Sequence, residues 1–97
     1  MTGFLIATVR VKDEEKFGEY AAKAGPLVAQ FGGQVTLRGG LAKTLAGDAS
    51  PHKVAIMQFP DLDAIDNWFA SDGYQAIIPL RDQACDMDLF AYAGPPA

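Results

Sequence analysis

Alternating apolar and polar side chains predict four β-strands in this chain, because successive residues of a strand face opposite sides of a sheet. The predicted strands are residues 4–11, 34–38, 52–59 and 86–92. Glycine pairs and prolines between these segments supply the turn residues that end strands and helices. The segment after the second strand, residues 41–45, has the composition of a short additional edge strand.

Apolar residues at helical spacing predict helices after the first and third strands. The first helix follows Asp13, whose carboxylate can accept hydrogen bonds from the first free backbone N–H groups. The second follows Asp61, and Ser71 caps a further helical segment. We expect a kink at Pro26 and a bend at Pro79, because proline removes a helical N–H and crowds the preceding turn.

The resulting order, β-α-β-β-α-β, predicts an α+β fold of the ferredoxin-like, split-βαβ kind in one domain over residues 1–97. Such a fold is a four-stranded antiparallel sheet with its helices on one face. The other face then has no cover from its own chain.

Alternation assigns one consistently apolar side of the sheet to the helices. That set is Leu5, Ala7, Val9, Val35, Leu37, Ala55, Met57, Phe59, Met87, Leu89 and Ala91. The other side is mixed: Phe4, Ile6, Thr8, Arg10, Gln34, Thr36, Arg38, His52, Val54, Ile56, Gln58, Asp86, Asp88, Phe90 and Tyr92. This mixed face is too apolar for bulk water and too polar for a dry core. We therefore expect a homodimer whose sheets pack face to face around a partly polar cavity.

Composition narrows the class of protein. The 97 residues carry 8 Lys+Arg against 12 Asp+Glu, and this acidic balance argues against a nucleic-acid partner. No apolar run approaches the roughly 20 residues of a membrane span, and the N-terminus does not have the pattern of a signal peptide. The lone Cys85 predicts neither a disulfide nor a multi-cysteine metal site. The glycine pairs also lack the spacing of a dinucleotide fingerprint. From these features together we expect a cytoplasmic protein with no cofactor and no metal.

An ordered set of short motifs resembles the domain-of-unknown-function 1330 (DUF1330) family of the dimeric α+β barrel superfamily. The motifs are Gly32-Gly33, Arg38-Gly39-Gly40, Leu45-x-Gly47, Phe59-Pro60, Ala64, Trp68, Ser71, Tyr74-Gln75 and Leu80-Arg81. The resemblance covers roughly residues 4–92. It implies a face-to-face dimer with a small cavity in each subunit, and relatives such as cofactor-independent monooxygenases and muconolactone-isomerase-like enzymes. Ala46 and Ala93 stand where the family often has an acidic residue, so chemistry that relied on those acids is not expected here.

Arg38 is the first candidate for a ligand-binding residue. It ends a strand on the mixed face and precedes Gly39 and Gly40, whose backbone a ligand can approach closely. Its guanidinium can bind a carboxylate or polarise a carbonyl. The alternative is a salt bridge to Asp86 or Asp88 on a neighbouring strand.

Aromatic and basic residues of the helices are further candidates. Tyr74 and Arg81 can point the same way on the last helical segment and orient an anion, or they can simply pack and anchor that helix. Trp68 and Tyr20 can line a pocket or belong to the core. His52 is the only histidine and a candidate proton-transfer group, although a surface position is the plainer interpretation.

Two classes of function remain open at this point. The first is an enzyme, a cofactor-independent monooxygenase, isomerase or lyase acting on a small carboxylate or enolisable compound. Arg38 would hold the anion, Tyr74 and His52 would move protons, and Gly39, Trp68 and Arg81 would contribute to binding. The second is a non-catalytic ligand-binding protein or a dimeric interaction module.

Overall fold

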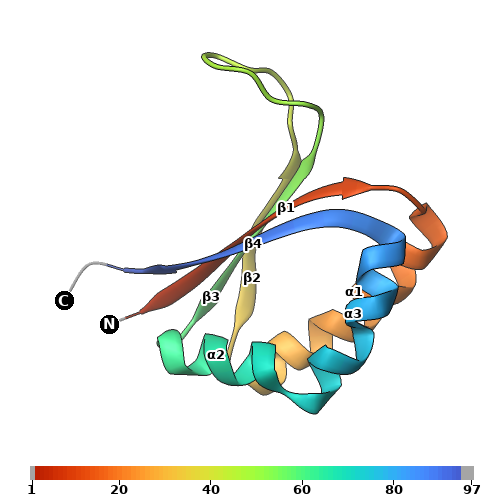
Figure 1. Cartoon of the computed structure of the whole chain (residues 1–97). Coiled ribbons are helices and arrows are strands. Elements are labelled where there is room, and N and C mark those ends of the chain that lie inside the picture. Colours follow the sequence, from red (N-terminus) through yellow and green to blue (C-terminus); the bar gives the residue numbers. More distant parts are fainter. Residues whose placement is uncertain (1, 95–97) are drawn as a thin grey trace.

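The computed structural model, which describes residues 2–94, has the expected order of strands and helices (Figure 1). The elements are β1 (Gly3–Val11), α1 (Glu14–Gln30), β2 (Gln34–Gly40), β3 (Lys53–Phe59), α2 (Leu62–Ala70), α3 (Asp72–Ala84) and β4 (Cys85–Ala93). The strands form one antiparallel sheet in the order β2-β3-β1-β4. This is the ferredoxin-like α+β fold, and it places β2 and β4 at opposite edges of the sheet.

The three helices begin at the residues that the sequence indicates. The side chains of Asp13, Asp61 and Ser71 accept hydrogen bonds from the backbone N–H three residues further on, at 3.0, 2.8 and 3.2 Å. α1 continues through Pro26 and α3 through Pro79, so each proline lies inside a single helix. The bend expected at each proline stays a prediction.

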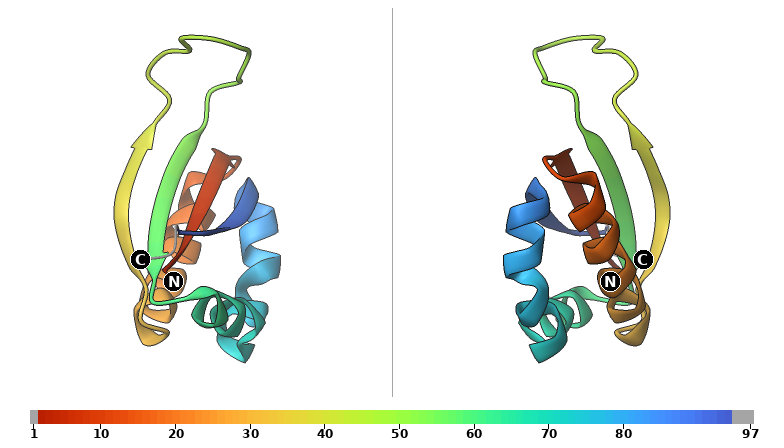
Figure 2. Two further views of the ribbon diagram at one scale, coloured as in Figure 1. Left: turned by 90° about the vertical axis from the view of Figure 1, so that its left-hand side faces the viewer. Right: turned by 90° about the vertical axis from the view of Figure 1, so that its right-hand side faces the viewer.

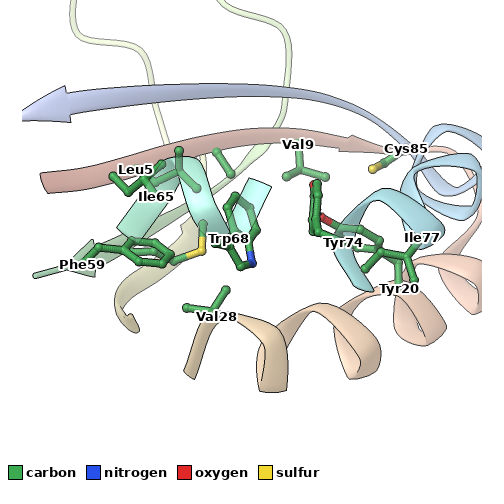
Figure 3. Packing of buried hydrophobic residues seen from close by; sticks show 12 residues of the cluster. Leu5, Val9, Tyr20, Val28, Phe59, Ile65, Trp68, Tyr74, Ile77 and Cys85 are labelled. Carbon is green, nitrogen blue, oxygen red and sulfur yellow. The ribbon is translucent and has the colours of Figure 1, made fainter. Parts of the chain in front are cut away.

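The core lies between the sheet and the helices and combines aliphatic side chains with the aromatic rings of Tyr20, Phe59, Trp68 and Tyr74 (Figure 3). Trp68 of α2 lies at its centre, with ring centroids 4.3 Å from Tyr74 and 5.9 Å from Phe59. β1 and β4 arch over the helices (Figure 1). α1 packs chiefly against α3 and not on the sheet, which leaves space between α1 and the strands.

A β-bulge in β2 overturns the face that alternation assigned to Arg38. Val35 pairs with Met57, but the next pair is Leu37 with Ile56, so Thr36 is an extra residue in β2. The Thr36 hydroxyl donates to the backbone carbonyl of Ile56 at 3.1 Å. One extra residue exchanges the two faces for everything that follows it.

The prediction for Leu37 and Arg38 was therefore wrong. Leu37 lies on the face away from the helices and is 66% exposed. Arg38 pairs with Ala55 and lies on the side of the sheet that faces the helices.

The connection between β2 and β3 also differs from the prediction. Residues 41–52 contain no strand, so the short edge strand expected at 41–45 does not form. The Leu41 N–H donates to the carbonyl of His52 at 2.8 Å, which adds one bond to the hairpin. Beyond that bond the loop projects away from the helices and the rest of the sheet (Figure 2).

The face of the sheet away from the helices carries exposed apolar side chains. Leu37, Phe90 and Tyr92 are all exposed there, and the rings of Phe4 and Tyr92 stack at 5.2 Å. We call this surface, made by Phe4, Ile6, Leu37, Val54, Ile56, Phe90 and Tyr92, the open face. Within residues 2–94, no helix is both long enough and apolar enough to cross a membrane. The cytoplasmic location expected from the sequence stays a prediction.

Candidate ligand cavity

A cavity of about 430 Å³ lies between α1, α2 and the side of the sheet that faces the helices. Small residues make room for it, with Ala24 and Gly25 on α1 opposite Ala7 and Ala55 on the sheet. The lining is mostly apolar and comprises Ala7, Val9, Phe17, Tyr20, Ala21, Ala24, Gly25, Val28, Val35, Arg38, Gly39, Gly40, Lys53, Val54, Ala55, Met57, Trp68, Met87 and Leu89. Pockets of this size and composition are typical of small-molecule sites.

The charged side chains of the cavity are both basic. Among the described residues that line it, only Arg38 and Lys53 carry a charge. Arg38 pairs with Ala55, and Lys53 lies two residues before Ala55 on the same side of β3, so the two cations are near neighbours. The Lys53 ammonium lies 5.8 Å from the ring centroid of Phe17 on α1. The cavity is therefore locally positive in a chain whose formal net charge is −4.

Trp68 presents a hydrogen-bond donor that the protein itself does not satisfy. The residue is only 2% exposed, and its Nε1 atom has no partner within the described part of the chain. Figure 3 shows the indole nitrogen at the edge of the ring that faces α1. Because a buried donor without an acceptor costs roughly 1–3 kcal/mol, an acceptor bound in the cavity would relieve that cost.

Tyr20 lines the same cavity with its phenol, and its hydroxyl is hydrogen-bonded to residues that do not line the cavity. Its Oη atom lies 2.8 Å from Oη of Tyr74, which is fully buried, and Nη1 of Arg81 donates to the Tyr74 hydroxyl at 3.1 Å. Burial raises the pKa of Tyr20 above its usual range. Tyr20 is therefore a neutral phenol at physiological pH.

Tyr74 and Arg81 do point toward one another, as their spacing predicts, but neither lines the cavity. The other side of the Arg81 guanidinium contacts the carboxylate of Asp82 at 3.2 Å. The ring of Tyr74 packs on Trp68, and its hydroxyl bonds to the side chains of Tyr20 and Arg81. Both residues thus stand behind Tyr20, and their direct contact with a ligand, as expected from the sequence, stays a prediction.

The salt bridge considered for Arg38 does not form within the chain. Asp86 and Asp88 lie on β4, at the edge of the sheet opposite to β2. Asp86 instead pairs with Lys12 at 3.5 Å. In residues 2–94, Arg38 makes no ion pair and no side-chain hydrogen bond, which leaves its guanidinium free for a ligand.

His52 is not part of this cavity. It is the last residue of the loop before β3, and its Nδ1 atom lies 2.8 Å from the carbonyl oxygen of Ser50. The described residues contain no cluster of three or more potential metal ligands, so His52, Asp86 and Asp88 do not converge. Gly39 and Trp68 line the cavity together with Arg38.

Lys53 was missed from the sequence as a ligand contact. It precedes Ala55 and Met57 by two and four positions, so alternation alone places it on the side that faces the helices. Tyr20 was considered as a pocket or core residue and does line the cavity, but nothing in the sequence indicates its bond to Tyr74, 54 positions away.

The four-stranded sheet and its helices define a small α+β protein of the ferredoxin-like kind, and comparison with known families gives the particular group. The model of the family described as "Domain of unknown function (DUF1330)" matches residues 2–95, and the chain belongs to this family. The resemblance noted from the sequence motifs is thereby confirmed. No curated protein matches the chain.

Solved structures share the fold over almost the whole chain. RPA0582, a protein of unknown function from Rhodopseudomonas palustris, superposes with a TM-score of 0.83 at 20% identity, covering 99% of this chain and 84% of that one. SnoaB, a cofactor-independent oxygenase from Streptomyces nogalater, has a TM-score of 0.71 at 14% identity, with coverages of 99% and 95%. The hydroxynitrile lyase from Passiflora edulis has a TM-score of 0.74 at 14% identity, with the same coverages. A protein from Mesorhizobium loti, described as a dabb family protein with a ferredoxin-like fold, has a TM-score of 0.60 at 16% identity, with coverages of 97% and 99%.

Proposed function

We propose that this protein binds a small organic anion with a largely apolar body in the cavity between α1 and the sheet. The observation that carries the proposal is the pairing of an apolar lining with two cations, Arg38 and Lys53, and no described acidic residue. An uncompensated guanidinium beside an apolar cavity favours a carboxylate, which it can bind through two parallel hydrogen bonds. The unpartnered Nε1 of Trp68 adds a donor for a second acceptor on the ligand.

The chemistry that these side chains support is stabilisation of negative charge on oxygen. Arg38, Lys53, Trp68 and neutral Tyr20 are all donors, whereas the described lining holds no carboxylate or imidazole to act as a base. Donors held in place around a developing oxyanion lower the energy of an enolate. The substrate class we propose is therefore a small carboxylate that enolises readily.

The proposed reaction class is a cofactor-independent oxygenation, isomerisation or lysis of such a compound. The shared fold of a cofactor-independent oxygenase and a hydroxynitrile lyase supports this class by analogy only. Non-catalytic binding in the same cavity is the alternative, and it is favoured by the lack of a carboxylate or imidazole that could act as a general base in the described lining.

Binding is tested by thermal shift with a panel of aromatic and aliphatic carboxylates on wild type and Arg38→Met. Methionine keeps much of the apolar stem and removes the guanidinium. Arg10→Met is the matched control, because Arg10 is an exposed arginine that contacts Ser50 and does not line the cavity. We expect a carboxylate that stabilises wild type and Arg10→Met but not Arg38→Met. Equal responses in all three proteins would contradict the site.

Catalysis is tested separately with phenylpyruvate, which carries a ring, a carboxylate and an enolisable ketone. Exchange of its β-hydrogens in deuterated buffer, followed by proton NMR, reports enolate formation. An enzyme of the proposed class accelerates the exchange above the buffer rate, and Arg38→Met abolishes the acceleration. Binding of phenylpyruvate without acceleration would favour the non-catalytic alternative.

We further propose a homodimer that buries the open face against its copy. The support is the exposure of Leu37, Phe90 and Tyr92 on that face, where a row of apolar residues crosses the sheet from Leu37 through Ile56 and Ile6 to Phe90. Stable interfaces bury about 1,200–2,000 Å² in total, which one face of a four-stranded sheet can supply. Sedimentation velocity at micromolar concentration tests this assembly, and a stable species of one chain mass would refute it.

A further inference from the structure

The hydrogen bonds behind the cavity have a direction, and Arg81 sets it. A guanidinium can only donate, so the Arg81 Nη1 atom donates to the oxygen of Tyr74 at 3.1 Å. The hydroxyl hydrogen of Tyr74 must then find its own acceptor. Tyr74 is fully buried, and the acceptor within reach in the described residues is the Tyr20 oxygen at 2.8 Å.

The opposite arrangement leaves a buried hydrogen without an acceptor. If Tyr20 donated to Tyr74, the hydrogen of Tyr74 would point into packed core and cost the protein an unmade hydrogen bond. Tyr20 avoids this problem, because its hydrogen can point to the sulfur of Met87, and both residues line the cavity. The chain of donors therefore runs from Arg81 through Tyr74 to Tyr20.

Within residues 2–94, the Tyr20 hydrogen has only a weak acceptor. The nearest recorded acceptor is the sulfur of Met87 at 3.8 Å, and a thioether is a poor one. Successive hydrogen bonds that start at a cation polarise one another, so the last donor in the chain is stronger than an isolated phenol. Tyr20, the last donor of this series, thus presents a strengthened O–H to a ligand in the cavity.

We propose that Tyr20 binds a carbonyl or enolate oxygen of the ligand, with Tyr74 and Arg81 acting as positioning residues behind it. This inference rests on the proposed function, since it concerns the same cavity and defines its ligand further. The ligand class becomes a molecule with two acceptor ends, a carboxylate and a separate carbonyl oxygen, joined by an apolar body.

The topology of the sheet spaces the two ends. Arg38 lies on β2 at one edge, whereas Tyr20 approaches Met87 on β4 at the other edge. Three strand spacings of about 4.8 Å separate the edges by about 14 Å. A ligand that reaches both residues therefore needs its two acceptor ends well apart, and a six-membered ring with substituents at opposite positions is a simple body of this kind.

The test uses two probes of matched shape, 4-acetylbenzoate and 4-ethylbenzoate, titrated into the protein and followed by NMR. The probes share the ring and the carboxylate and differ only in a C=O replaced by CH₂. Wild type should bind 4-acetylbenzoate about 3- to 10-fold more tightly, the range expected for one hydrogen bond. Tyr20→Phe should remove this preference, while Tyr92→Phe, an exposed tyrosine on the open face, should keep it.

The positioning role is read from the ratio of the two affinities and not from either affinity alone. Tyr74→Phe keeps the Tyr20 hydroxyl but disconnects it from Arg81, so the ratio should fall part of the way. A purely structural role of Tyr74 would weaken both probes equally and leave the ratio unchanged. Should Tyr20→Phe fail to fold, the ratio in Tyr74→Phe still decides the question.

Failures of this inference and of the proposed function give different results. Arg38→Met should weaken both probes by the same factor with the ratio preserved. Equal binding of the two probes by wild type, or a ratio unaffected by Tyr20→Phe, overturns the role of Tyr20 and leaves the anion site standing. Binding of neither probe overturns the proposed function, and the role of Tyr20 falls with it.

Discussion

Replacing Tyr74 with phenylalanine is the most direct measure of the hydrogen-bond chain in the core. The change removes one oxygen atom and keeps the ring, so the packing of that ring on Trp68 at 4.3 Å is retained. What is lost is a hydroxyl that accepts from Arg81 and contacts Tyr20. The effect on stability therefore reports these two bonds and not the loss of buried apolar surface.

The expected cost follows from how well each former partner can be hydrated. A hydrogen bond to a charged group contributes about 1.5–3 kcal/mol, but the Arg81 side chain is 16% exposed, so water replaces part of this bond. The bond to Tyr20 is a neutral one of about 1 kcal/mol, and the adjoining cavity can supply water to that phenol. Together these give a loss of about 2 kcal/mol in the free energy of unfolding. For a domain of this size, that lowers Tm by about 8–16 °C.

The assay is differential scanning calorimetry of wild type, Tyr74→Phe and Tyr92→Phe at one protein concentration. Tyr92→Phe is the matched control, because it deletes the same atom from a hydroxyl that has no partner among the described residues and keeps the ring that the proposed dimer would bury. We expect the control to stay within about 0.5 kcal/mol of wild type. If Tyr74→Phe is no less stable than this control, the reasoning about the buried chain is wrong.

Three further predictions concern the assembly, the backbone and the thiol. Ile56→Asp places a charge on the open face and should dissociate the proposed homodimer in sedimentation velocity. Gly18→Ala should stabilise the protein by about 0.5–1 kcal/mol in urea unfolding, because Gly18 lies inside α1 and an added Cβ meets nothing within 4 Å. In the same assay Gly33→Ala should cost about 1–3 kcal/mol, because its Cβ would lie 2.7 Å from the ring of Phe59. Burial raises the pKa of the Cys85 thiol, so less thiolate is present at pH 8 than in free cysteine, and labelling by a disulfide reagent should be slow until urea unfolds the chain.

Each of these has an outcome that would contradict it. A dimer that survives Ile56→Asp would place the interface elsewhere. A loss of stability in Gly18→Ala, or none in Gly33→Ala, would mean that α1 does not lie as described. Labelling of native Cys85 at the rate of a free thiol would show that its sulfur is accessible and not buried as described.

The sequence by itself determined the elements and their order. Alternation and helical spacing are properties of neighbouring residues, so they located four strands and the helices between them to within two residues at nearly every end. The caps at Asp13, Asp61 and Ser71 are equally local, since each side chain bonds a backbone group three residues away. The ordered motifs were sufficient to indicate the family, and the family model agrees.

The tertiary structure decided which way Arg38 faces. Strict alternation placed it on the mixed face, but the extra residue at Thr36 exchanges the two sides of β2 from Leu37 onward. The sequence holds no local signal for this bulge, because a bulge is defined by pairing with another strand, here with Ile56 of β3. The cavity and its positive charge depend on that one residue of register.

The donor chain was likewise beyond the reach of the sequence. Tyr20 comes from α1, and Tyr74 and Arg81 come from α3, so their contacts exist only where the two helices pack together. The lack of a hydrogen-bond partner for Nε1 of Trp68 depends on all the atoms that surround it in the fold, and the residues next to it in sequence give no sign of it. Periodicity specifies which residues point inward, whereas the partner that each polar atom meets there depends on how elements distant in sequence are brought together.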